Sequence, residues 1–291
     1  MNPLARKNFR DRLASGQTMW IPGSYDVLSA LLIERAGFDA VLVSGFGVAA
    51  SLLGMPDTEL YTMSENLGVL RATCHAVDIP VMADGDTGYG NAINVMRMVR
   101  EFEQAGVASI SIEDQESPKK CPAVSDATHI IPFEEAVGKV RAAVATRRDP
   151  DLVIIARTDA RDPAEAIRRA RAFVEAGADA IKPISKCFNT IEGLRELRAA
   201  CGRPLAISVL GLIERHLNTA DIESLGGIAT FPLTPLLTAA QALRANLAQL
   251  MATKRPSGLP VPAMAETEFK HLIGFDQVEA LERQFLPQDA A

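Results

Sequence analysis

The sequence has little of what several classes of protein require. Its 291 residues contain four cysteines, at positions 74, 121, 187 and 201, and no two of them form a CxxC pair. It also contains only four histidines, and none is spaced from another as zinc ligands are. These shortages argue against a disulfide framework and against a zinc site.

Long apolar runs and dense basic stretches are missing as well. No run is long enough to cross a bilayer, and the first ten residues lack the apolar core of a signal peptide. The formal net charge is −6, and Lys and Arg form no continuous stripe. We therefore expect no nucleic-acid partner, no membrane partner and a location in the reducing cytoplasm.

What the sequence does contain is a regular alternation of short apolar runs with longer amphipathic segments. The runs are apolar on both faces, as in a parallel sheet that is covered on each side. The predicted strands are residues 19–21, 40–43, 81–84, 109–113, 152–157, 180–184, 205–209 and 228–231. Eight strand–helix units predict an α/β fold, a single (β/α)8 barrel over residues 1–254. An open, doubly wound sheet is the alternative interpretation.

Residues 255–291 have a different character. A Pro- and Gly-rich linker at residues 255–262 precedes two helix-like segments, residues 266–273 and 275–284. We expect a linker and a C-terminal helical extension, which could pack on a neighbouring subunit or fold back on its own barrel.

Acidic residues follow the predicted strands where each strand ends. Asp84 and Asp86 close the third strand, Glu113 closes the fourth, and Asp57 lies in the loop after the second. In a (β/α)8 barrel these ends surround the active site, and clustered carboxylates repel one another unless a cation lies between them. Oxygen ligands of this type suit Mg²⁺, with Mn²⁺ as the alternative ion. For any one of these acids alone, a helix cap or a surface charge is the simpler interpretation.

Two further segments carry candidate chemistry. Arg157 ends an apolar strand, where it could bind a substrate carboxylate through two hydrogen bonds or form a salt bridge with Asp159 or Glu113. Cys121 follows Lys119 and Lys120, and two lysines beside a thiol lower its pKa. The stretch 116–129 has little periodic pattern, as in a mobile loop over the strand ends or an ordinary surface loop.

Taken together, these motifs resemble the isocitrate lyase/phosphoenolpyruvate mutase superfamily over most of the chain, from about residue 21 to 243. The matching segments are 22–26 (PGSYD), 44–47 (SGFG), 53–57 (LGMPD), 84–91 (DGDTGYGN), 112–115 (IEDQ), 118–121 (PKKC) and 155–160 (IARTDA). In combination they are highly specific.

The resemblance implies a Mg²⁺ site and a carboxylate site side by side. The implied metal ligands are Asp57, Asp84, Asp86 and Glu113, partly through water. The implied substrate contacts are Ser44, Gly45, Phe46 and Arg157, and the implied catalytic residues are Cys121, Arg157 and Asp57. The resemblance further implies a gating loop that carries Cys121, and homotetramers in which C-terminal helices swap between neighbouring barrels.

The sequence departs from the superfamily pattern in three places. Pro122 and Ala123 follow Cys121 where Gly-His is usual; the sixth strand has Ile184 where a Glu is usual; the seventh has Ser208 where an Asn is usual. The metal and enolate half of the implied site is intact. Lys182, on the sixth strand, could replace a lost polar partner and bind a distal carboxylate.

The presence of Cys121 favours carbon–carbon bond cleavage, because the lyase branch uses this residue as general acid/base. We therefore expect a Mg²⁺-dependent lyase that acts on a small 2-hydroxy di- or tricarboxylate of the methylisocitrate or dimethylmalate kind, through an enolate. Decarboxylation or hydrolysis of oxaloacetate is the first alternative. A phosphonopyruvate mutase or hydrolase, and a metabolite-binding barrel without activity, are weaker alternatives.

Overall fold

The computed structural model describes the whole chain except residues 1, 3, 121–128, 185 and 287–291. The chain divides into two compact units, residues 1–236 and 237–291. The predicted boundary between residues 254 and 255 was drawn at the linker, whereas the first unit ends within a helix that begins at Thr234.

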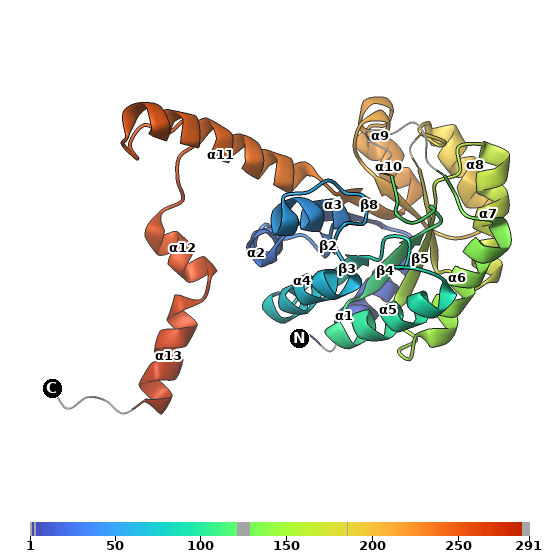
Figure 1. Cartoon of the computed structure of the whole chain (residues 1–291), viewed down its shortest axis with the longest axis horizontal. Helices are drawn as coiled ribbons and strands as arrows, with labels where there is room; N and C mark the ends of the chain where they lie inside the picture. Colours follow the sequence, from blue (N-terminus) through green and yellow to red (C-terminus); the bar gives the residue numbers. More distant parts are fainter. Residues whose placement is uncertain (1, 3, 121–128, 185, 287–291) are drawn as a thin grey trace. The chain divides into compact units, whose positions relative to one another are not determined.

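The first unit is a closed barrel of eight parallel strands in sequence order, with helices outside it (Figure 1). The strands are β1 (Thr18–Ser24), β2 (Val41–Val43), β3 (Val81–Asp84), β4 (Ser109–Glu113), β5 (Val153–Thr158), β6 (Ala180–Pro183), β7 (Leu205–Ser208) and β8 (Gly227–Phe231). Because β1 pairs with β8 in parallel, the sheet has no open edge. The predicted (β/α)8 barrel is confirmed, and the open-sheet alternative is wrong.

The helices of the first unit include the expected amphipathic segments and several short ones. They are α1 (Ala5–Ala14), α2 (Val27–Arg35), α3 (Gly45–Val48), α4 (Met63–Ala76), α5 (Ala92–Ala105), α6 (Phe133–Thr146), α7 (Pro163–Glu175), α8 (Ile191–Cys201), α9 (Leu212–His216) and α10 (Thr219–Leu225), with a π-helical turn, η1 (Ala49–Leu53), after α3. Glycines end α5 and follow α7 at positive φ (102° at both Gly106 and Gly177), where a side chain would be strained.

The inside of the barrel is filled by side chains. Inward-facing strand residues pack in one cluster with Phe9 and Leu13 of α1, and among them are Met19, Ile21, Leu42, Met82, Ile155 and Ile228. Two larger clusters fill the space between the strands and the outer helices. The barrel therefore has a packed core, and the side chains free to do chemistry lie at the carboxyl ends of the strands and in the loops after them.

β1 is longer than the predicted run of residues 19–21, because the chain stays extended through Pro22 and Gly23. A Cβ built on Gly23 would lie 2.3 Å from the carbonyl oxygen of Pro232. Glycine therefore allows the backbone at the end of β1 to approach the backbone just after β8, at the rim of the barrel.

The second unit contains the greater part of α11 (Thr234–Thr253), then α12 (Glu266–Leu272) and α13 (Phe275–Phe285). Asn246 of α11 exchanges two hydrogen bonds with the backbone of Val261 in the linker, at 2.8 and 3.0 Å. α11 and α13 have no buried residues. Across the described ranges, none of the helices combines the length and the apolar character that a membrane span requires.

Candidate active site

The carboxyl ends of the strands surround a cavity of about 360 Å³. One part of its wall is polar and comes from the loops and ends of β2 to β6: Ser44, Phe46, Asp57, Asp84, Lys119, Arg157 and Lys182. The other part is mostly apolar and comes from the ends of β6, β7 and β8 and the segments after them. Most of the residues predicted for the site therefore line one cavity.

The acidic turn after β3 is held in an unusual conformation. Asp86 is a non-glycine residue at φ 47°, and the preceding Gly85 donates its backbone N–H to the carbonyl of Ser111 at 2.8 Å. At the end of β4, Glu113 donates its N–H to the carbonyl of Asp86, also at 2.8 Å. These bonds fix the strained turn to β4, and such strain is frequent at functional sites.

Asp86 is buried and surrounded by hydroxyl donors. Both Tyr61 and Tyr89 donate to its Oδ2, and Asn66 bonds the hydroxyl of Tyr89 at 2.8 Å and the carbonyl of Asp84 at 2.9 Å. Burial raises the pKa of Asp86 to about 6, against the opposing effect of Lys119. Burial also raises the pKa of Tyr61, which therefore stays a donor.

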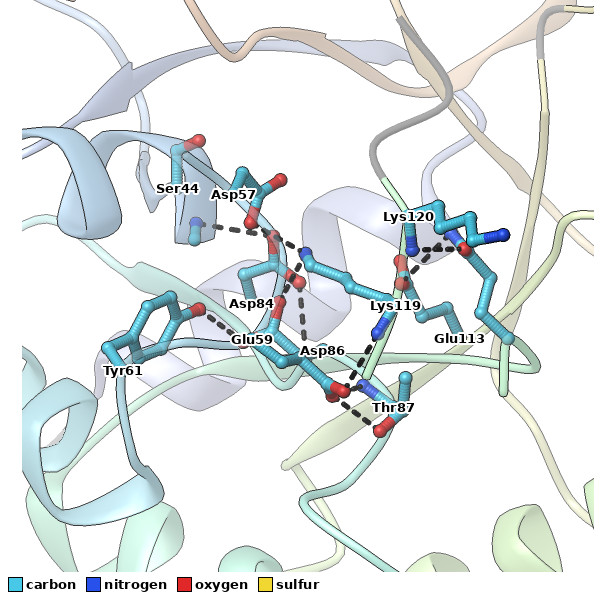
Figure 2. A network of polar contacts seen from close by, with 12 residues as sticks. Ser44, Asp57, Glu59, Tyr61, Asp84, Asp86, Thr87, Glu113, Lys119 and Lys120 are labelled. Atoms are coloured by element: carbon cyan, nitrogen blue, oxygen red, sulfur yellow. Dashed lines mark hydrogen bonds and ion pairs between the residues drawn. The ribbon is translucent and has the colours of Figure 1, made fainter. Parts of the chain in front are cut away.

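Lys119 lies at the centre of the acidic group (Figure 2). Its Nζ is 2.9 Å from Oδ1 of Asp57 and 2.5 Å from Oδ1 of Asp86, and its side chain is only 3% exposed. Burial opposes the charge of this ammonium, but the surrounding carboxylates raise its pKa well above the ordinary value. Lys119, one of the two lysines that were expected to lower the pKa of the Cys121 thiol, is the buried counterion of two predicted metal ligands.

Glu113 and Arg157 form a second buried pair. The guanidinium of Arg157 contacts Oε2 of Glu113 at 2.5 Å and Oδ1 of Asp159 at 2.9 Å. Gln115 donates to both acids, at 3.2 and 3.3 Å, and accepts from the backbone N–H of Lys120 at 3.1 Å. The salt-bridge interpretation of Arg157 is thus realised, although the same side chain also faces the cavity.

Glu59 joins the loops around the acidic turn. This residue, at φ 56°, accepts hydrogen bonds from the N–H and the hydroxyl of Thr87 and from the backbone N–H of Lys119. It therefore holds the start of the segment that follows β4 against the turn that follows β3 (Figure 2).

The donor chemistry suits a hard divalent cation. The four predicted ligands offer only carboxylate oxygens, and two of these, Oδ1 of Asp57 and Oε2 of Glu113, are buried with ion pairs, to Lys119 and Arg157, as their only polar contacts among the described residues. However, within the described ranges no three acidic, histidine or cysteine side chains converge as metal ligands do. The ammonium of Lys119 lies between Asp57 and Asp86 instead, so a metal here would require this side chain to move.

The Ser44–Gly45–Phe46 segment forms the start of α3. Ser44 accepts weakly from the N–H of Gly47 at 3.5 Å, and the N–H of Gly45 donates to Oδ2 of Asp84 at 3.2 Å. Burial favours a higher pKa for Asp84, but Lys119, Lys182 and Arg157 together lower it. The amide of Gly45, expected to receive a substrate anion, is therefore engaged by an ionised Asp84 in this arrangement.

Lys182 points to the same cavity from β6. It is 92% buried, and in the described part of the chain it has neither an ion pair nor a hydrogen bond. Burial, followed by the charge of Arg157, lowers its pKa. Ile184 and Ser208, which stand at the two departures on β6 and β7, also line the cavity. Cys121 lies outside the described residues.

Comparisons with known proteins agree with this architecture. Residues 9–252 match the family model described as phosphoenolpyruvate phosphomutase. The chain is 39% identical to a 2,3-dimethylmalate lyase of Eubacterium barkeri, over 98% of this chain and 99% of that protein. It is 37% identical to a 2-methylisocitrate lyase of Aeropyrum pernix, over 95% and 90%. A crystal structure of phosphonopyruvate hydrolase with oxalate and Mg²⁺ superposes with a TM-score of 0.88 at 32% identity, over 99% and 100%.

Proposed function

Because the chain belongs to the phosphoenolpyruvate mutase/isocitrate lyase superfamily, it is an enzyme of the lyase type, and we propose that it cleaves a carbon–carbon bond in a small 2-hydroxy di- or tricarboxylate. The observation that supports this most is the cavity itself. Carboxylates, a paired guanidinium and an unpaired ammonium face one space at the carboxyl ends of the strands, where barrel enzymes place their chemistry.

In this proposal the two halves of the substrate lie on different parts of the wall. Arg157 and the Ser44–Phe46 segment hold the carboxylate and the hydroxyl of the half that becomes a 2-oxo acid. Asp57, Asp84, Asp86 and Glu113 hold Mg²⁺, or Mn²⁺ in its place. A bound divalent ion supplies positive charge beside the reacting oxygen, and the neighbouring relative complexed with Mg²⁺ supports a metal of this kind.

The reaction breaks the C2–C3 bond. The hydroxyl proton passes to solvent, the C2 oxygen becomes a carbonyl oxygen, and the electron pair of the C2–C3 bond passes to C3 as an enolate of the second carboxylate. Cys121 donates a proton to C3, and Lys182 holds the second carboxylate while the charge develops. Asp57 takes part by binding the metal, and without the metal its pair with Lys119 holds it in the acidic group.

Turnover of a substrate panel tests this function. The full chain with Mg²⁺ is incubated with four- to seven-carbon hydroxy and oxo diacids while release of pyruvate, glyoxylate and CO₂ is followed. We expect 2-oxo acid release from a 2-hydroxy acid, and a loss of about 10²–10⁴-fold in kcat for Cys121→Ser. The absence of release from every hydroxy acid, with either metal, would contradict the proposal.

A second candidate is decarboxylation or hydrolysis of oxaloacetate. The cavity has Ile184 and Ser208 at positions where the superfamily pattern places a Glu and an Asn, and the chemistry of oxaloacetate needs fewer polar groups at these positions. CO₂ release that survives Cys121→Ser would favour this candidate over the lyase.

We further propose that the protein assembles as a homotetramer with exchanged C-terminal helices. Large apolar side chains of the second unit are exposed in the single chain, among them Leu243, Leu247, Met251, Leu281 and Phe285. Large apolar side chains left exposed in such number are typical of an interface with a partner. Light scattering of the full chain and of a chain that ends at residue 254 tests this: a tetramer in both would contradict the helix exchange.

A further inference from the structure

A second hollow, of about 420 Å³, lies at the amino ends of β7 and β8, at the end of the barrel opposite to the acidic site. It is bordered by α8, by α10, which packs against α8, and by the turns that lead into the two strands. Three arginines line it, Arg195, Arg198 and Arg203. In the described chain no acidic side chain lines it. This arginine hollow is therefore positively charged.

The three arginines have no counterion among the described residues. The one hydrogen bond that their guanidiniums make there runs from Nη2 of Arg195 to Oγ of Ser224, at 3.0 Å. Arginines at the amino ends of other strands are paired instead: Arg6, for example, contacts Asp149 before β5 at 2.9 Å. The arginine hollow thus departs from the way the same end of the barrel balances its charge elsewhere.

The sequence concentrates this charge. Residues 195–203 (RELRAACGR) contain three arginines and one acid, Glu196, in a chain with a formal net charge of −6. Arg195 and Arg198 are three residues apart on α8, so they share one face of the helix, and like charges at this spacing repel each other. Glu196 on α8 and Glu223 on α10 are both exposed, and neither pairs with these arginines in the described chain. An anion bound in the hollow would relieve the repulsion.

The elements that carry the arginines are fixed by the core of the barrel. Leu194 and Leu197 of α8 and Leu225 at the end of α10 are buried, so the two helices are held against the strands. Nη1 of Arg198 lies beside the turn into β8, since a Cβ built on Gly226 would be 3.4 Å from it. The guanidiniums therefore project from rigid elements into one space.

The end of α8 lies in the same place, and free carbonyls at a helix end repel an anion. Two of these carbonyls are already occupied by donors. The carbonyl of Arg198 accepts from the N–H of Gly202 at 2.8 Å, and the carbonyl of Ala200 accepts from Nε of Arg171 at 3.1 Å. The helix end thus opposes an anion less than an uncapped end would.

We propose that the arginine hollow binds a small phosphate-bearing anion, with the guanidiniums of Arg195, Arg198 and Arg203 as its ligands. A guanidinium matches phosphate oxygens through two parallel hydrogen bonds, and three guanidiniums favour a group with two or more negative charges over a monocarboxylate. The volume of about 420 Å³ suits a small molecule, since such sites measure about 300–1,000 Å³. This site is separate from the proposed lyase chemistry, and its test needs no substrate.

Calorimetry of the full chain with inorganic pyrophosphate tests the proposal. Mg²⁺ is left out, so that no complex of metal and pyrophosphate forms at the acidic site. We expect one pyrophosphate per chain with a Kd below about 1 mM, and a loss of about 5–20-fold in affinity for Arg198→Gln. The double variant R198Q/R203Q should show no saturable binding up to about 10 mM. Arg141→Gln, which removes an exposed arginine of α6, is the matched control and should keep the parent affinity.

Thermal melting of the same proteins gives a second readout. Pyrophosphate at about ten times its Kd should raise the midpoint of the parent by about 3–6 °C more than that of R198Q/R203Q. Multivalent anions also stabilise proteins because they are excluded from the surface, and the comparison with the double variant removes this general effect. The midpoint of the double variant without pyrophosphate shows that it is folded.

The outcomes decide between the arginine hollow and the active-site cavity. Affinity that falls in Lys182→Met and persists in R198Q/R203Q would assign the anion to the active-site cavity and overturn the proposal. Equal affinity of the parent and the double variant, or no binding by the parent up to about 10 mM, would overturn it as well. Parallel titrations with phosphate and ADP identify the ligand of a hollow that binds: ADP tighter than pyrophosphate indicates a nucleotide, and equal affinity indicates the diphosphate group alone.

Discussion

Replacement of Lys182 by methionine should stabilise the protein while it removes activity. Methionine has a similar length and needs no counterion, and Lys182 is 92% buried with no ion pair or hydrogen bond to the described residues. Replacing buried charge by apolar side chains of similar volume is typically neutral or stabilising by about 1–4 kcal/mol. For a single unpaired ammonium at the edge of a cavity we expect about 1–3 kcal/mol.

The stabilising effect of Lys182→Met should depend on pH, because the pKa of Lys182 differs between the native and the unfolded state. Burial, and then the charge of Arg157, lowers the pKa of Lys182 below its ordinary value of 10.5. The native state therefore binds this proton less tightly than the unfolded state does. The resulting loss of unfolding free energy is present in full when the pH is below the pKa of Lys182 in the native state. It disappears as the pH rises to the ordinary lysine pKa. The stability difference between Lys182→Met and the parent should shrink accordingly as the pH rises.

Urea unfolding followed by circular dichroism, at about pH 7 and about pH 9.5, measures both effects. A thermal melt at neutral pH should place the midpoint of the variant several degrees higher, since each kcal/mol corresponds to roughly 2–4 °C in a domain of this size. A variant less stable than the parent at neutral pH would show that the ammonium has a stabilising partner in the protein, and the reasoning about an unpaired cation would fail.

Three further predictions concern the acidic half of the site. Without added metal, Lys119→Met should lose about 3–5 kcal/mol of unfolding free energy, because Asp57 and Asp86 lose their cation. Added Mg²⁺ should restore part of this loss, and unchanged stability of the variant would contradict the prediction. Mg²⁺ affinity, measured by calorimetry, should fall by up to about tenfold per pH unit below about pH 6. Burial raises the pKa of Asp86 to about 6, and the metal requires its ionised form. Equal affinity at about pH 5 and about pH 7.5 would refute this prediction. Gly85→Ala should lose about 1–3 kcal/mol by thermal melting, because its Cβ would lie 2.7 Å from the carbonyl oxygen of Ser111, whereas Gly68→Ala on α4 has open space around it and should not destabilise.

The fold was predictable because its signals are local and repeated. β3 and β4 begin and end as predicted, and β5 is displaced by one residue. The apolar runs are buried on both faces. A strand that is covered on both sides must be apolar at nearly every position, so its sequence is easy to recognise. β1 was predicted too short because Pro and Gly usually end a strand, whereas here Pro22 and Gly23 continue it. Gly23 also allows the close approach of β1 to the segment after β8.

Which residues lie in the site was more predictable from the sequence than which of their charged side chains contact each other. The strand ends bring Asp84, Glu113 and Arg157 to one cavity or its rim, as the register of parallel strands requires. The partner of each charge depends instead on loops. Lys119 reaches Asp57 and Asp86 because Glu59 holds its backbone, and sequence spacing contains no sign of that contact.

The balance of charge around the cavity shows which kind of ion its acidic half can bind. Around the cavity, Asp57, Asp84, Asp86, Glu113 and Asp159 are met by three buried cations, Lys119, Arg157 and Lys182. When all are ionised, two negative charges remain uncompensated, which is the charge that one divalent cation supplies. Without that ion, burial raises the pKa of Asp86 and of Glu113, so protons can neutralise part of the excess. Lys182 shares in this balance without an ion pair to these acids, because its charge helps to lower the pKa of Asp84. The acidic half of the cavity is therefore built to gain a cation.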